Sequence, residues 1–303
     1  SSSEMNVSEE ILNRTSDKYR KIRNTIKFLL SNIADYNPED LSNKSITVEL
    51  DKWILRRAFK TQGEIKKHYE SYNFHLLSQT IHSFCVNDLG SFYLDIIKDR
   101  QYTCKKDSQE RLSAQHSMYC ITKMLLLWIA PICPHTAEEA WSHLPKNKDK
   151  SIFYNNWFVI EDSIIGKSNI NDDNWNCVLE IKKIVSKALE EKRSENIIGS
   201  PLDADVVLHC SSELKNILNV FENELKFIFI TSSVTLNKLN NKVSDTIEID
   251  NNKISVAIKN SPNNKCDRCW HKCATVGEDK KYNNICSRCI SNVYGDGEIR
   301  KNA

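Results

Sequence analysis

The chain has 303 residues, of which 40% are hydrophobic and 27% are charged, and its formal net charge is +2. This composition is ordinary for a folded globular protein and excludes a chain that is disordered by composition. The 7 glycines and 6 prolines are few for this length, which favours long helices over a loop-rich or all-β architecture. The small net charge decides little about a nucleic-acid partner, because acidic residues elsewhere can cancel local basic stripes.

The N-terminal sequence SSSEMNVSEE has no cationic start and no apolar run, so we expect no signal peptide. A stretch of about 18 apolar residues that could span a bilayer is also lacking. We therefore expect a cytoplasmic protein with no membrane partner. The cysteine count of 11 is odd, which argues against a complete disulfide framework and agrees with a reducing compartment.

The first expected helix begins at Ser8. Its apolar residues recur at helical spacing and predict one buried stripe: Ile11, Tyr19, Ile22, Ile26, Leu29 and Ile33. The opposite face is basic, because Arg20, Arg23 and Lys27 fall within about 60° of one another on a helical wheel. This basic ridge (Arg20, Arg23 and Lys27) is either a solvated helix face or a surface that meets RNA phosphates.

More helices are expected in the rest of the N-terminal half. The apolar spacing predicts one helix from about 49 to 69 and another from 74 to about 97. Residues 120–130 are apolar nearly all round, which suits the central member of a bundle. Thr136 is expected to begin a short helix, with Glu139 completing a capping box. Short connections between such helices favour an antiparallel bundle.

A domain boundary is expected near residue 160, where the sequence becomes rich in Asn, Asp and Lys. The predicted fold class is mainly α: an antiparallel helical bundle at 1–160, a small α/β module at 161–261 and a C-terminal zinc ribbon with four cysteine ligands at 262–303. The elements expected in the α/β module are a helix through 175–189, a strand at 205–210, a helix at 214–225, a buried strand at 227–230 and two strands within 246–259.

Two C-x-x-C pairs lie near the C-terminus, Cys266 with Cys269 and Cys286 with Cys289, and sixteen residues separate them. Four thiolates at this spacing suit a tetrahedral Zn²⁺ ion with Zn–S bonds of ~2.3 Å. Redox dithiols and ordinary core cysteines fit this polar segment less well. Because four sulfur ligands leave no open position for water, we expect one structural zinc ion without a catalytic role.

Several residues beside the cysteine pairs are further candidates. Cys273 and His271 are close enough in sequence for either to replace one of the four ligands. Arg268 lies inside the first pair, Trp270 follows it directly, and Arg288 has the matching place in the second pair. A small module cannot bury a Trp deeply, so we expect a guanidinium and the indole side by side on a rigid edge that stacks unpaired bases, at ~1–3 kcal/mol per base. Arg288 is also expected to bind tRNA. The alternative is that Trp270 packs over the metal as a miniature core.

Ordered segments along the chain resemble those of one family. SDKYRKIRNTIKFLLSNI (16–33), FYLDIIKDRQY (92–102) and APICPHTAEEAW (130–141) resemble the anticodon-binding helical domain of bacterial isoleucyl-tRNA synthetase. ALEEKRSENIIGSPLDADVVL (188–208) is similar to the junction module of that family. KCDRCW and CSRCISNVYGDGEIRK resemble its terminal zinc module. The resemblance covers the whole chain.

The resemblance implies the C-terminal portion of a class I ligase that joins isoleucine to tRNA(Ile) through an isoleucyl-adenylate. ATP and Mg²⁺ would be bound only by the N-terminal catalytic domain, because the H-I-G-H and K-M-S-K-S motifs of class I synthetases do not occur in this chain. The segment alone is then expected to be catalytically inactive and monomeric, with tRNA(Ile) and that catalytic domain as partners. By resemblance, Arg268 and Trp270 would contact the anticodon loop, and the basic ridge would lie along the tRNA.

Two alternatives stay open at this point. The chain could be a free-standing zinc-ribbon protein that binds nucleic acid. DNA glycosylases of the formamidopyrimidine type end in a similar finger, although their nucleophile is an N-terminal proline, and Ser1 with the helical N-terminal half argues against them. Among synthetases, the valine and leucine enzymes share the helical domain, and the zinc module favours isoleucine.

Overall fold

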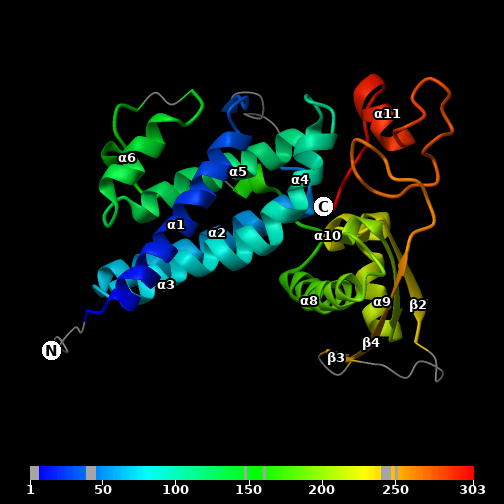
Figure 1. Cartoon of the computed structure of the whole chain (residues 1–303). Coiled ribbons are helices and arrows are strands. Elements are labelled where there is room, and N and C mark those ends of the chain that lie inside the picture. The colour runs from blue at the N-terminus through cyan, green and yellow to red at the C-terminus, as the bar shows by residue number, and fades with distance from the viewer. Residues whose placement is uncertain (1–6, 39–45, 147–148, 160–161, 240–246, 250–251) are drawn as a thin grey trace. The chain divides into compact units, whose positions relative to one another are not determined.

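The computed structural model describes residues 7–38, 46–146, 149–159, 162–239, 247–249 and 252–303. Helices dominate (Figure 1). They are α1 (Glu9–Asn32), α2 (Glu49–Glu70), α3 (Phe74–Ser83), the π-helical η2 (Phe84–Tyr93), α4 (Leu94–Thr103), α5 (Gln109–Ile129), α6 (Pro134–Ser142), α7 (Asp162–Ile165), α8 (Asp172–Ser194), α9 (Ser212–Asn219), α10 (Leu225–Phe229) and α11 (Ser287–Tyr294). The strands are β1 (Ala204–Cys210), β2 (Ser233–Lys238), β3 (Ile247–Ile249) and β4 (Asn252–Asn260).

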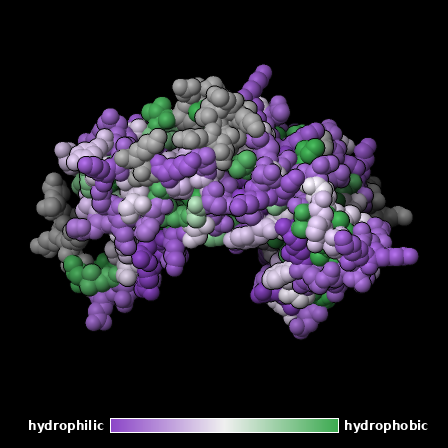
Figure 2. All heavy atoms as spheres, turned by 90° about the horizontal axis from the view of Figure 1, so that it is seen from above, coloured by the Kyte–Doolittle hydropathy of each residue, from purple (hydrophilic) through white to green (hydrophobic). Residues whose placement is uncertain are grey.

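The chain forms two compact units. The first unit consists of Ser1–Ile46, Ile54–Asp95 and Leu112–Gly166, and the second of Thr47–Trp53, Ile96–Arg111 and Lys167–Ala303. The boundary expected between 160 and 161 falls on residues outside those described, so the three-part division stays a prediction. No helix of the described part is both long enough and apolar enough to cross a membrane. The face in Figure 2 is mostly hydrophilic, with hydrophobic side chains in small separate groups.

The first unit is built on the apolar helix α5, as its composition predicts. Trp128 on this helix is fully buried, and its indole N–H donates to Gln62 Oε1 at 3.1 Å. The Tyr69 hydroxyl donates to the carbonyl oxygen of Trp128 at 2.6 Å. A buried polar group is costly unless it is hydrogen-bonded, so the bond to Gln62 offsets the cost of burying the indole N–H of Trp128.

Helix α1 is confirmed, but its apolar stripe is buried only in the C-terminal half. Ile26 and Leu29 are buried, whereas Ile11 is 47% exposed and Tyr19 39% exposed. The Tyr19 hydroxyl pairs with that of Thr136 at 2.8 Å. Helical periodicity shows which side chains share a face, but not how far a neighbouring element covers that face. The predicted stripe is therefore wrong for the first turns.

The start of helix α6 also differs from the prediction. The helix begins at Pro134, with Cys133 as the N-cap and no side-chain capping bond. Proline suits the first helical position because its φ angle is already helical and the missing N–H would have no partner there. The expected capping box from Thr136 to Glu139 is thus wrong, and the Thr136 hydroxyl bonds to Tyr19 instead.

The second unit contains a four-stranded sheet in the order β2-β1-β4-β3. Strand β1 pairs in parallel with β2 and antiparallel with β4. Strands β3 and β4 pair antiparallel, with Ile249 opposite Asn252, which confirms the two strands expected there; the turn residues 250–251 lie outside those described. Helix α8 is confirmed, and its apolar face is buried: Trp175, Val178, Ile181, Val185 and Leu189.

The expected strand at 227–230 is wrong. Residues Leu225–Phe229 form helix α10, which Ile230 ends in a left-handed conformation at φ 60°. The chain then enters strand β2 at Ser233. A short apolar run suits a buried strand and a buried helix equally well, and periodicity alone does not separate them. The expected helix at 214–225 is shorter as well, since α9 ends at Asn219.

Candidate zinc centre and nucleic-acid interface

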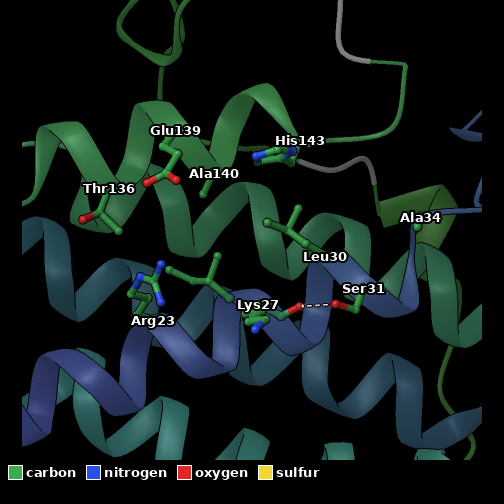
Figure 3. Close-up of a pocket in the computed structure, with 10 residues that line it drawn as sticks. Arg23, Lys27, Leu30, Ser31, Ala34, Thr136, Glu139, Ala140 and His143 are labelled. Atoms are coloured by element: carbon green, nitrogen blue, oxygen red, sulfur yellow. Dashed lines mark hydrogen bonds between the residues drawn. The ribbon is translucent and has the colours of Figure 1, made fainter.

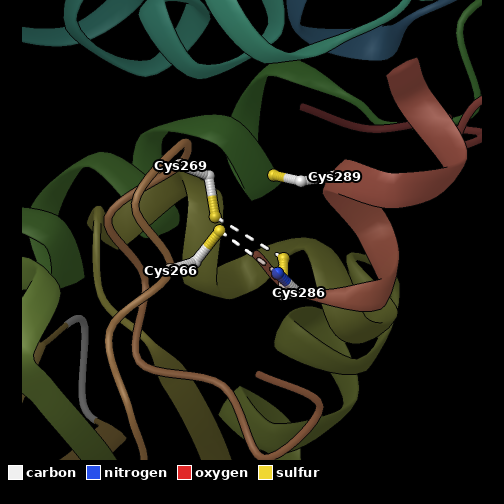
Figure 4. A group of neighbouring side chains, drawn as sticks. All are labelled: Cys266, Cys269, Cys286 and Cys289. Atoms are coloured by element: carbon white, nitrogen blue, oxygen red, sulfur yellow. Dashed lines mark hydrogen bonds between the residues drawn. The ribbon is translucent and has the colours of Figure 1, made fainter. Parts of the chain in front are cut away.

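Four cysteines converge in the C-terminal part of the second unit (Figure 4). Cys266 and Cys269 lie on the turn that follows β4, Cys286 is the N-cap of α11, and Cys289 lies in its first turn. All four side chains are buried, and their sulfur atoms lie within 4.8 Å of one another. The Sγ atoms of Cys269 and Cys286 are 3.8 Å apart.

The donor set fits a zinc ion. A tetrahedron with Zn–S bonds of ~2.3 Å has sulfur–sulfur edges of ~3.8 Å, which matches the distance between Cys269 and Cys286. The amide N–H of Cys286 donates to Cys266 Sγ at 3.3 Å, a bond that favours the thiolate form. The amide of Trp270 donates to the carbonyl oxygen of Cys266 at 2.9 Å and closes the first turn. These residues can therefore hold Zn²⁺ with four sulfur ligands.

The two substitute ligands lie outside this group. Cys273 is half-buried and packs against the four cysteines together with Val276 and Ile285. His271 is buried, with Nδ1 3.1 Å from the carbonyl oxygen of Cys269. Its ring packs edge-on against Phe227, with the centroids 5.7 Å apart. His271 and Cys273 thus contact the cluster, and the Cys273 side chain bonds to those of Cys269 and Cys286, whereas the two C-x-x-C pairs form the group of four sulfur atoms within 4.8 Å of one another.

The indole of Trp270 faces solvent. Its side chain is 60% exposed, so it does not form a miniature core over the cysteines. Its backbone is left-handed, with φ 66°, which is rare for a bulky residue and costs of order 1–3 kcal/mol. Lys265 Nζ lies 5.4 Å from the ring centroid. The turn thus presents an aromatic ring and a cation together at the surface.

Arg268 and Arg288, one inside each C-x-x-C pair, both bond to the last turns of α4. The Arg268 guanidinium donates to the carbonyl oxygens of Tyr102 and Thr103. The Arg288 guanidinium donates to both carboxylate oxygens of Asp99, at 2.8 and 3.0 Å. The C-terminal end of α4 therefore bonds to one arginine from each half of the zinc module. These bonds fix the orientation of the module within this unit.

Arg288 lies in a different environment from Trp270. Its side chain is only 15% exposed, and it pairs with Asp99 and Glu298, so it does not lie on an exposed stacking edge. The expectation that Arg288 binds tRNA came from its matching place in the second C-x-x-C pair. Spacing does not reveal that α4 and the segment after α11 supply carboxylates at this point.

A buried ionic network surrounds Arg288. Arg300 also pairs with Asp99 and Glu298, and the Phe227 ring centroid lies 5.1 Å from Arg288 Cζ and 3.4 Å from Arg300 Cζ. Burial alone would raise the pKa of Asp99, but the charges of Arg300 and Arg288 outweigh it and hold this pKa below its ordinary value. The Asp99 side chain is therefore ionised at neutral pH. Sequence reasoning missed Asp99, Glu298 and Arg300.

The basic ridge lies in the first unit, on α1. Arg20, Arg23 and Lys27 are all exposed, and Arg20 pairs with Asp17 at 2.9 Å in a solvated contact, a kind of pair worth only ~0–1 kcal/mol. Arg23 and Lys27 line a cavity of about 380 Å³ between α1 and α6 (Figure 3). Its other lining residues are Ile26, Leu30, Ser31, Ala34, Thr136, Glu139, Ala140 and His143. The basic ridge thus borders this cavity, which a helical wheel of α1 alone could not predict.

Comparison with known proteins agrees with this architecture. Residues 51–208 match the family described as "Anticodon-binding domain of tRNA ligase". Residues 263–292 match the family described as "Zinc finger found in FPG and IleRS", and this match includes all four cysteines of the cluster.

Relatives with similar sequences include isoleucine–tRNA ligases. That of Shewanella woodyi is 42% identical over 301 residues, which are 99% of this chain and 32% of the relative. That of Ruthia magnifica is 43% identical with the same coverage, and that of Vesicomyosocius okutanii is 40% identical over 327 residues, covering 98% of this chain and 34% of the relative. The chain spans about a third of the length of these relatives. With a matched helical domain that covers more than half of its residues, the chain belongs to the family of anticodon-binding domains of tRNA ligases.

Proposed function

We propose that this chain is the C-terminal, tRNA-recognising part of an isoleucine–tRNA ligase and that it binds tRNA(Ile) at the anticodon. The observation that carries the proposal is the four-cysteine module, which holds Trp270 exposed in a left-handed turn, in a chain whose helical part matches anticodon-binding domains. The relatives that match almost the whole chain are isoleucine–tRNA ligases. Formation of isoleucyl-adenylate, with its ATP and Mg²⁺, would belong to the parts of such an enzyme beyond this segment, which alone would be inactive.

Trp270 would act as a stacking surface for an unpaired base. Anticodon bases can be splayed out of the loop, and aromatic side chains stack on them while cations hold the neighbouring phosphates. Lys265, close to the indole ring, is placed to supply such a cation. A bound zinc ion would supply only rigidity here, because four sulfur ligands leave no open coordination position.

Arg268 and the basic ridge would have separate roles. Arg268 donates two of its hydrogen bonds to the end of α4. It would therefore hold the turn of the first C-x-x-C pair in place as well as contact RNA. The ridge cations are solvated and would neutralise phosphates along the tRNA. Arg288, whose donors face Asp99 and Glu298, would position the module and would not contact RNA.

The zinc-finger match by itself would also allow a glycosylase, because its description names FPG as well as IleRS. The match of residues 51–208 to anticodon-binding domains favours the ligase. A free-standing zinc-ribbon protein is disfavoured because the relatives that match the whole chain are about three times its length.

The proposal is tested by replacing Trp270 with alanine and titrating a fluorescently labelled anticodon stem-loop of tRNA(Ile) with the zinc-loaded chain. Loss of one stacked base, worth ~1–3 kcal/mol, should raise the dissociation constant by at least about fivefold. Trp270→Phe should retain much of the affinity. Tyr154→Ala removes an aromatic side chain that is 80% exposed in the first unit and serves as the matched control. An unchanged dissociation constant for Trp270→Ala would refute the stacking role.

A further inference from the structure

We propose that the zinc module carries a second stacking surface for unpaired RNA bases, formed by Tyr282 and Tyr294. The two rings lie face to face, with centroids 4.2 Å apart and an angle of 17° between their planes. Tyr294 is nevertheless 60% exposed, so the pair is not a small buried core. An aromatic face that stays open to solvent can receive another flat ring. The inference rests on the proposed RNA-binding function and adds a contact that is separate from Trp270.

A different part of the chain holds each of the two rings in place. Tyr294 is the last residue of α11, which starts after Cys286 and contains Cys289. Tyr282 lies in the loop before α11, where the Asp279 carboxylate accepts the amide N–H groups of Lys281 at 2.8 Å and Tyr282 at 3.0 Å. The metal-binding turn and this carboxylate-stabilised turn therefore order both rings before any partner binds, which lowers the entropy cost of binding.

The charge beside the rings favours nucleic acid. Lys281 Nζ lies 5.0 Å from the centroid of the Tyr282 ring, and Lys280 next to it is exposed. Among the acidic residues near the rings in sequence, Asp279 already bonds to backbone amides, whereas Glu278 and Asp296 are exposed. Proteins that bind single-stranded nucleic acid combine aromatic stacking surfaces with such cations, because a base presents a π-face while its phosphate needs a positive charge.

The proposed ligand class is therefore an unpaired nucleotide of the same RNA that Trp270 contacts. Trp270 follows the first C-x-x-C pair, whereas Tyr282 precedes the second pair and Tyr294 follows it. The module would thus contact RNA through both halves of its ribbon. Stacking tolerates any base, so this second surface would add affinity more than it adds sequence selectivity.

The test is the substitution Tyr294→Ala in the full zinc-loaded chain, with a transcript of the complete tRNA(Ile) as the probe in a fluorescence-anisotropy titration. Loss of one stacked base should raise the dissociation constant about 5- to 150-fold. Tyr294→Phe should bind like the unchanged chain, because the ring is retained, and Tyr294→Leu should bind like Tyr294→Ala. Tyr154→Ala again serves as the control, and the zinc content of every variant is measured so that a lost fold is not read as a lost contact.

A second readout locates the contact directly. With 4-thiouridine in the transcript, ultraviolet crosslinking followed by mass spectrometry should identify the peptide that contains Tyr294. If Trp270→Ala weakens binding but Tyr294→Ala does not, and no crosslink reaches Tyr294, the second surface is refuted and the proposed function stands. If Tyr294→Leu binds as tightly as the unchanged chain, the ring has no stacking role, and a protein partner becomes the better explanation of the exposed pair. If the unchanged chain does not bind the transcript, both proposals fail.

Discussion

Removing the Asp99 carboxylate should destabilise the second unit strongly. Asp99 accepts hydrogen bonds from Arg288 and pairs with Arg300, and the three side chains are 16%, 15% and 1% exposed. Breaking a buried ion pair by removing one partner costs ~3–5 kcal/mol, because the other charge is left buried without compensation. Glu298 still faces both guanidiniums in Asp99→Ala, so we expect the lower end, about 3 kcal/mol. For a unit of this size that lowers the melting temperature by roughly 6–12 °C.

The assay is differential scanning calorimetry of the zinc-loaded chain, with the transition of the second unit identified by its shift on chelation. Asp107→Ala removes an exposed carboxylate in the same unit and should change stability by less than about 0.5 kcal/mol. Asp99→Asn keeps the shape of the side chain without the charge. Its melting temperature should lie between those of Asp99→Ala and Asp107→Ala. A melting temperature for Asp99→Ala within 2 °C of that of the unchanged chain, well short of the ~6–12 °C expected, would refute the view that this carboxylate holds the zinc module to α4.

The remaining predictions concern the ridge and the thiols. Replacing Arg20, Arg23 and Lys27 together by alanine should reduce the slope of log affinity for tRNA against log salt by about 2 to 3, since fewer counterions are released on binding; an unaltered slope would mean that the ridge only faces water. Burial raises the pKa of Cys85 and Cys120 to about 12. At pH 8, iodoacetamide should therefore label them at least a hundredfold more slowly than a free thiol of pKa ~8.5. Peptide mass spectrometry that finds rapid labelling of both would contradict their burial.

The features that the sequence predicts well are those set by local spacing. The two C-x-x-C pairs predict the sulfur group because four ligands within a short ribbon need little help from the rest of the chain. Long periodic segments such as α1 and α8 are likewise found where expected. The apolar composition of α5 indicates its central place, and Trp128 is fully buried there.

The features that the sequence does not predict depend on partners that are distant in the chain. Asp99 and Arg288 are 189 residues apart, and no local pattern marks them as a pair. The run from Phe227 to Ile230 is too short for its period to separate helix from strand. Exposure of Ile11 depends on which elements reach the first turns of α1, which is a tertiary property. The stacked rings of Tyr282 and Tyr294 also arise only when α11 folds beside the preceding loop.

We propose that a zinc ion held by Cys266, Cys269, Cys286 and Cys289 orders the module through which the chain binds tRNA. The most direct measurement is the affinity for the tRNA(Ile) anticodon stem-loop of one sample before chelation, after complete chelation and after zinc is added back, with the zinc content determined at each stage. We predict about one zinc ion per chain at the start, at least a tenfold loss of affinity on chelation, and recovery when zinc is restored. A chain that contains no zinc, or one that keeps its fold and its full affinity after the metal is removed, would contradict the account.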